Sequence, residues 1–84
     1  MKVEIFVKLN SMDDVKEFNK ICCNFISDID VKPVNTRFLV DGKSILGLFS
    51  LNLSKTLSVT INAVTDMEAR RFGYEFEKFM IKAE

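Results

Sequence analysis

Two segments of the chain alternate hydrophobic and polar residues with the period of two that is typical of β-strands. The first segment places four apolar side chains on one face: Val3, Ile5, Val7 and Leu9. Phe6 lies on the other face and is the exception to this pattern. The second segment, residues 57–64, mixes β-branched and apolar residues and has the strongest strand pattern in the chain. We therefore expect two strands, each with a face packed against a core.

Two other segments have hydrophobic residues at helical spacing. A helix is predicted over residues 12–26, where Ser11 followed by Asp14 makes a start that resembles a capping box. The apolar face of this helix would hold Val15, Phe18, Cys22 and Phe25. A last helix is predicted from Asp66, with a wide apolar stripe formed by Ala69, Phe72, Phe76, Phe79 and Met80.

The middle of the chain is predicted to form a hairpin and a short helix. Residues 28–32 and 36–41 favour strands and are separated by turn-forming residues that include Pro33. Ser44 is then expected to cap a second, short helix. The predicted order of elements is therefore βαββαβα.

This order predicts an α+β fold, in which a four-stranded antiparallel sheet is covered on one face by three helices. A chain of 84 residues is long enough for one compact domain with a small core. We therefore expect residues 1–84 to form a single domain, with most of the eight phenylalanines in its core.

The charge and hydropathy of the chain argue against several classes of partner. Its 12 basic and 12 acidic residues give no net charge, which disfavours binding to nucleic acid or to an anionic membrane. For the same reason, an aromatic platform that stacks RNA bases on the open sheet face is a weak alternative. The sequence shows no membrane-spanning segment and no signal-peptide pattern. We therefore expect a cytoplasmic protein.

The chain offers few groups for metal binding or redox chemistry. It contains no histidine, and two cysteines alone cannot complete a four-ligand zinc site. Cys22 and Cys23 are adjacent in the sequence, so a disulfide between them would be strained. Cys22 also lies on the predicted apolar helix face, where a buried thiol stays protonated and inert. We expect free thiols, no metal and no cofactor.

The sequence DGKS, residues 41–44, contains the Gly-Lys-Ser of a nucleotide-binding loop. Such a loop also needs a glycine five residues before Gly42, where this chain has Arg37. We therefore interpret Gly42 as part of a turn and Ser44 as the N-cap of the following helix.

Residues 40–61 resemble the middle of the histidine-containing phosphocarrier protein family, HPr, of the bacterial sugar phosphotransferase system. The resemblance extends over nearly the whole chain. It is carried by a Lys-Ser-Ile-x-Gly-x-x-Ser-Leu run that matches Lys43, Ser44, Ile45, Gly47, Ser50 and Leu51. It implies an HPr-like open-faced β-sandwich with the same βαββαβα order.

The resemblance fails at the HPr phosphorylation motif, a histidine followed by x-Arg-Pro at the start of the first helix. The histidine position falls on Ser11, and the arginine and proline positions fall on Asp13 and Asp14. A serine phosphoester is too stable for a reversible relay, and two carboxylates would repel a phosphoryl dianion. We therefore expect no catalytic residue and no enzymatic activity.

The resemblance implies a non-catalytic HPr-like protein, a regulatory or partner-binding module related to the sugar phosphotransferase system. Two alternatives stay open: an active phosphocarrier in phosphoenolpyruvate-dependent sugar transport with a non-histidine acceptor, and a domain of HPr fold with unrelated partners. The expected partners are of the HPr-binding type, namely enzyme I, sugar-system components, a kinase or a transcription regulator.

Two further expectations follow from the HPr resemblance. Ser44 matches the serine that an ATP-dependent kinase modifies in many HPr proteins, so it is a candidate regulatory phosphorylation site. The apolar arc of the second helix is wider than docking on a core requires, and the HPr positions that resemble Ile45, Leu46 and Phe49 contact partners. We expect these three side chains to be exposed beside Ser44 and to form a partner-binding patch.

Overall fold

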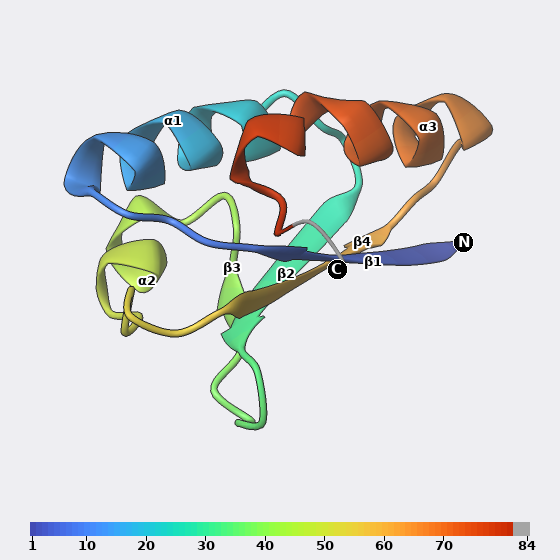
Figure 1. The fold of residues 1–84 in the computed structure, drawn as a ribbon. Helices are drawn as coiled ribbons and strands as arrows, with labels where there is room; N and C mark the ends of the chain where they lie inside the picture. The colour runs from blue at the N-terminus through green and yellow to red at the C-terminus, as the bar shows by residue number, and fades with distance from the viewer. Residues whose placement is uncertain (82–84) are drawn as a thin grey trace.

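The computed structural model describes residues 1–81, and its four strands form one antiparallel sheet in the order β1-β4-β2-β3 (Figure 1). The strands are β1 (Lys2–Val7), β2 (Asp28–Pro33), β3 (Val40–Asp41) and β4 (Leu57–Asn62). The helices are α1 (Met12–Cys22), α2 (Ile45–Phe49) and α3 (Asp66–Glu75), followed by the 3-10 helix η1 (Glu77–Phe79). The predicted α+β fold and βαββαβα order are confirmed.

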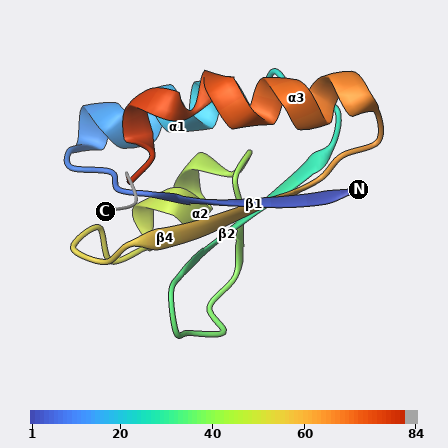
Figure 2. The same cartoon turned by 45° about the vertical axis from the view of Figure 1, so that its right-hand side comes forward.

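α1 and α3 form a layer over one face of the sheet and lie side by side across it (Figures 1 and 2). α2 lies below α1, level with the strands, and contacts both α1 and β3. Within residues 1–81, no helix combines the length and the apolar character needed to cross a membrane.

The strand register explains which residues of the sheet are buried. Ile5 pairs with Val59, which also pairs with Val31, and all three side chains are buried. Because side chains alternate between the two faces of a strand, Phe6 belongs to the next row, on the open face. There it pairs with Ser58, and its side chain is 45% exposed. The exception in the first strand pattern is therefore a residue of the open face.

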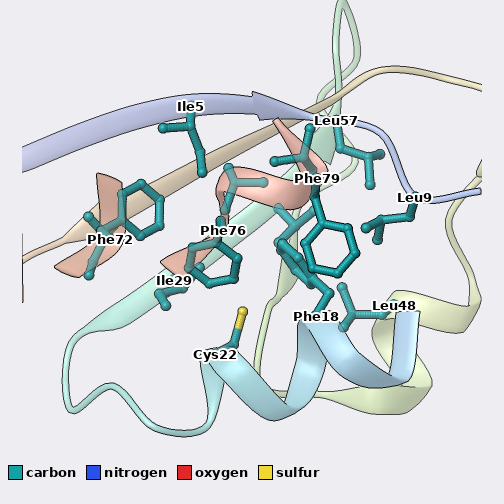
Figure 3. Close-up of a cluster of buried hydrophobic side chains, with 14 of the residues drawn as sticks. Ile5, Leu9, Phe18, Cys22, Ile29, Leu48, Leu57, Phe72, Phe76 and Phe79 are labelled. Atoms are coloured by element: carbon teal, nitrogen blue, oxygen red, sulfur yellow. The ribbon is translucent and has the colours of Figure 1, made fainter. Parts of the chain in front are cut away.

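Five of the eight phenylalanines are buried and form the centre of the core (Figure 3). Phe76 lies among three of the others: Phe18, Phe25 and Phe72. The centroid of its ring is 5.0, 5.9 and 5.3 Å from theirs, respectively. These separations fall in the range of favourable aromatic pairs. Phe76 therefore connects α1, α3 and the segment that leads to β2.

α1 ends at Cys22, earlier than the predicted residue 26. The backbone N–H groups of Ile26 and Ser27 donate to the carboxylate of Glu68 on α3, each at 2.9 Å. A side chain from a distant helix thus takes the place of carbonyl acceptors within α1. Phe25 is still buried, as predicted, although it reaches the core from a loop.

The predicted strand 36–41 is reduced to the two residues of β3. The residues before it form a loop in which Asn35 has a φ of 62°, a left-handed conformation that asparagine tolerates better than most residues. The hydroxyl of Thr36 donates to the carbonyl of Pro33 at 2.8 Å. These local contacts turn the chain away from β2 before longer pairing can form.

The predicted last helix divides into α3 and η1, and the chain then turns back to the sheet. The N–H of Lys8 donates to the carbonyl of Phe79 at 2.9 Å, and the N–H of Ile81 donates to the carbonyl of Phe6 at 3.0 Å. Residues 79–81 therefore cover one end of the edge strand β1.

Candidate functional site

Ser11 is the N-cap of α1, as predicted. Its Oγ accepts the N–H of Asp14 at 3.1 Å, and the Asp14 carboxylate accepts the N–H of Asn10 at 2.9 Å. This arrangement is a variant of the capping box, in which the carboxylate reaches the residue before the cap. Two backbone donors that an anion could use at the start of this helix are therefore already occupied.

The charges at the start of α1 are acidic. Asp13 and Asp14 both lie in its first turn, where carboxylates interact favourably with the helix dipole. Two carboxylates would repel a phosphoryl group at the same position. The ammonium group of Lys8, in the preceding loop, donates to the carbonyl of Leu53. These contacts stabilise the helix start and provide no cradle for a phosphate.

Ser44 is the N-cap of α2, also as predicted, and its Oγ accepts the N–H of Gly47 at 3.1 Å. The N–H of Lys43 donates to the Asp41 carboxylate at 2.9 Å, which closes the turn before the helix. The Lys43 ammonium lies 3.3 Å from the carbonyl oxygen of Ile26, near the end of α1. The Gly-Lys-Ser sequence thus forms a turn and a helix cap.

Gly42 is required by packing. A Cβ at this position would lie 2.9 Å from Sγ of Cys22 and 3.1 Å from Cγ2 of Ile29. Both distances are shorter than ordinary van der Waals contacts, so the backbone can approach α1 and β2 this closely only without a side chain. Nearby, the Asn19 side-chain amide donates to the Gly42 carbonyl at 3.1 Å.

The predicted apolar patch on α2 is smaller than expected. Leu46 is 79% exposed and Phe49 is 38% exposed, in agreement with the prediction. The expected exposure of Ile45 is wrong, because its side chain is half-buried and packs against the core. In a helix of only five residues, the first position lies close to the elements on both sides. The patch on α2 therefore consists of Leu46 and Phe49, and we call it the α2 patch.

The two thiols have different environments, and both are free. Cys22 is buried, and this burial, together with the nearby Cys23 and Asp41, raises the pKa of the Cys22 thiol well above its ordinary value. Cys23 is exposed, with its Sγ 3.9 Å from the carbonyl oxygen of Lys43. Residues 1–81 contain no cluster of three or more histidine, cysteine or acidic side chains suited to a metal ion.

Comparison with known protein families and with curated proteins finds no match for this sequence. Solved structures do match. HPr-C-His from Thermoanaerobacter tengcongensis has a TM-score of 0.62 and 27% identity, over 93% of this chain and 91% of that one. The phosphocarrier protein HPr from Bacillus anthracis str. Ames has a TM-score of 0.61 and 20% identity, over 84% and 90% of the two chains. The fold is HPr-like.

In this HPr-like fold, the two serines identified from the sequence are the N-caps of neighbouring helices: Ser11 caps α1 and Ser44 caps α2. Leu9, just before Ser11, and Leu48, on α2, lie in the same buried cluster (Figure 3). This shared cluster connects the start of α1 with α2. Met12, in the first turn of α1, is 53% exposed.

The HPr-like fold also contains a buried carboxylate that the sequence pattern did not reveal. Glu68 accepts hydrogen bonds from the N–H groups of Ile26 and Ser27 and from the Ser27 hydroxyl, and Arg71 lies 3.7 Å away. Burial alone would raise the pKa of Glu68. The hydrogen bonds and the Arg71 charge outweigh it, so the pKa of this carboxyl lies below its ordinary value.

Proposed function

We propose that this chain is a non-catalytic member of the HPr family. In this proposal it acts in the cytoplasm as a regulatory or partner-binding module related to the sugar phosphotransferase system. The observation that carries the proposal is the start of α1, where Ser11 and Asp14 cap the helix and the chain has no histidine. A phosphoryl relay needs an acceptor nucleophile and donors for the phosphate at this place.

Two other features support a role in binding. The HPr-like fold extends over most of the chain, so the surface around α2 keeps its place in the architecture. The α2 patch exposes apolar side chains next to Ser44, and exposed apolar side chains of this kind often mark interaction sites. A relay through the Cys22 thiol has little support, because Cys22 is buried and its thiol is held protonated.

We expect enzyme I and phosphoenolpyruvate to leave this protein without acid-labile phosphate. Intact-mass measurement before and after mild acid treatment checks this, with a histidine-containing HPr as the positive control. An acid-labile adduct would contradict the proposal and favour the active phosphocarrier. The variant Ser11→His combined with Asp13→Arg restores an acceptor and a cation, and acid-labile phosphate at position 11 would support the placement of the site.

We further propose that Ser44 is a site of regulatory phosphorylation. A phosphate on this N-cap would lie at the start of α2, where helix amides and the dipole favour negative charge by about 0.3–1 kcal/mol. Incubation with an HPr-type kinase and ATP, followed by peptide mapping, is expected to find phosphate at Ser44 and none in the Ser44→Ala variant. An unmodified Ser44 beside a phosphorylated HPr control would contradict this proposal.

If the α2 patch is a binding surface, replacing Phe49 should affect stability much less than replacing the nearby Leu51. Leu51 is 6% exposed, so Leu51→Ala is expected to lower the free energy of unfolding by about 2–4 kcal/mol. Phe49 is 38% exposed, so Phe49→Ala is expected to lower it by about 1 kcal/mol or less. The same Phe49 variant should weaken binding of an HPr-type partner by about 1 kcal/mol or more.

Urea denaturation of both variants, beside a binding titration with a partner isolated from the source cytoplasm, measures these effects. Equal and large losses of stability would show that Phe49 belongs to the core. In that case the α2 patch would not exist as a binding surface.

A further inference from the structure

The loop between β2 and β3, residues 34–39, exposes two large apolar side chains that are adjacent in the sequence. Phe38 is 52% exposed and Leu39 is 55% exposed. The loop extends away from the layer formed by α1 and α3, and both views show it projecting beyond the rest of the fold (Figures 1 and 2). We call Arg37, Phe38 and Leu39 the loop tip.

Hydrogen bonds within the loop hold the loop tip in place. The Thr36 hydroxyl donates to the carbonyl of Pro33 at 2.8 Å and accepts the N–H of Phe38 at 3.4 Å. At the base of the loop, the N–H of Val34 donates to the carbonyl of Thr56 at 3.0 Å. A loop that is already ordered loses less conformational entropy when it binds.

Basic residues accompany the loop tip. Arg37 is exposed within it. The Lys32 ammonium donates to the carbonyl of Thr36, the residue before Arg37, at 3.2 Å. Lys55 is exposed and precedes Thr56, so its backbone lies beside the base of the loop. These three cations therefore belong to the same end of the sheet.

Acidic residues are missing from this part of the sequence. Residues 31–40 and 42–63 contain none of the 12 acidic residues of the chain. The acidic residues nearest to the loop in the sequence are Asp30 and Asp41, which pair with each other and are separated from the loop by one further pair of β2 and β3. The chain as a whole has no net charge, but this end of the sheet is basic. A local charge of this kind can attract an anionic surface even when the net charge does not.

We propose that the loop tip docks on an anionic lipid surface. Phe38 and Leu39 enter the headgroup region of the bilayer, while the three cations approach the charged headgroups. A projecting apolar tip suits a bilayer because lipids adapt to its shape, whereas a protein partner would need a matching groove. Only two side chains are buried, so the binding is weak and reversible. The proposal goes beyond the role proposed for the α2 patch and does not depend on it.

The test is co-sedimentation of the full chain with vesicles of phosphatidylcholine, with or without about 40 mol% phosphatidylglycerol, at about 50 mM salt. We expect the anionic vesicles to bind about fivefold more protein or more, and about 0.5 M salt to abolish the difference. Equal binding to both kinds of vesicle, or no binding to either, would overturn the proposal.

Two matched variants assign the binding to the loop tip. Phe38→Glu and Tyr74→Glu both replace an exposed aromatic residue by an acid, and Tyr74 is 60% exposed on α3, on the other side of the sheet. Both variants should keep the melting temperature of the wild-type protein. Phe38→Glu is expected to lower binding to anionic vesicles by about fivefold or more, and Tyr74→Glu by less than about twofold. Equal losses would show that the loop tip does not enter the bilayer.

A second pair of variants tests the charge of the loop tip. Arg37→Ala should weaken binding to anionic vesicles by about threefold or more, whereas Arg70→Ala, which removes an exposed arginine from α3, should have little effect. Equal effects would contradict a specific contact through Arg37.

A short oligothymidine and poly-glutamate carry negative charge without an apolar interior, so both should bind much more weakly than the anionic vesicles. If either bound as tightly as the vesicles and lost this binding in Phe38→Glu, the loop tip would be a site for nucleic acid or for an acidic peptide. That result would overturn the lipid proposal.

Discussion

Replacement of Phe76 by alanine is expected to lower the free energy of unfolding by about 3–5 kcal/mol. The Phe76 side chain is fully buried, and its ring contacts those of Phe18, Phe25 and Phe72. Its removal therefore leaves a cavity bordered by α1, α3 and the loop between α1 and β2. Small domains are often stable by only about 5–15 kcal/mol, so this single change could remove a large part of the stability.

Urea denaturation monitored by circular dichroism measures this loss. Phe6→Ala is the matched control, because Phe6 is 45% exposed on the open sheet face and should cost much less. If the two variants lost similar amounts of stability, the aromatic cluster would not be the centre of the core.

The second large effect is expected for Glu68→Gln, which should lower the free energy of unfolding by about 2–4 kcal/mol at neutral pH. The Glu68 carboxylate accepts two backbone N–H groups and one hydroxyl. A glutamine keeps one oxygen acceptor but places an NH2 group against the remaining donors. A buried donor without an acceptor is costly.

The same carboxylate gives stability a defined dependence on pH. The pKa of Glu68 is lower in the folded protein than its ordinary value. Its contribution is therefore fully present above the ordinary pKa and is lost as the pH falls through the folded pKa. The Glu68→Gln variant lacks this titration, so its stability should change less between about pH 7 and about pH 3.

Glu77→Gln is the control for this experiment, since Glu77 is exposed. It should keep the pH dependence of the wild-type protein. Parallel pH profiles for the wild-type protein and Glu68→Gln would show that the Glu68 network does not stabilise the fold through its charge.

The sequence patterns predicted the order of elements because each one depends mainly on local spacing. The alternation in β1 and β4 and the apolar stripe of α1 identified faces that are buried in the structure. The two caps, Ser11 and Ser44, were also predictable, because the cap and the amide it binds lie within three residues.

The differences between prediction and structure come from contacts between distant residues. The early end of α1 depends on Glu68, which accepts from Ser27 across 41 positions of the chain. In the sequence, Glu68 is an acidic residue in the first turn of α3, where such residues are usually exposed. Ile45 was expected to face solvent, yet packing around a very short helix half-buries it. Neither environment can be deduced from local spacing.

The position of β4 in the sheet has a consequence for how the chain folds as it is made. β4 is the strand that pairs with both β1 and β2, yet residues 57–62 are synthesised long after either of them. Until this segment leaves the ribosome, β1 has no neighbouring strand and β2 has only the short β3. The sheet should therefore assemble late and in one step, and a nascent chain that ends before residue 57 should remain largely unfolded.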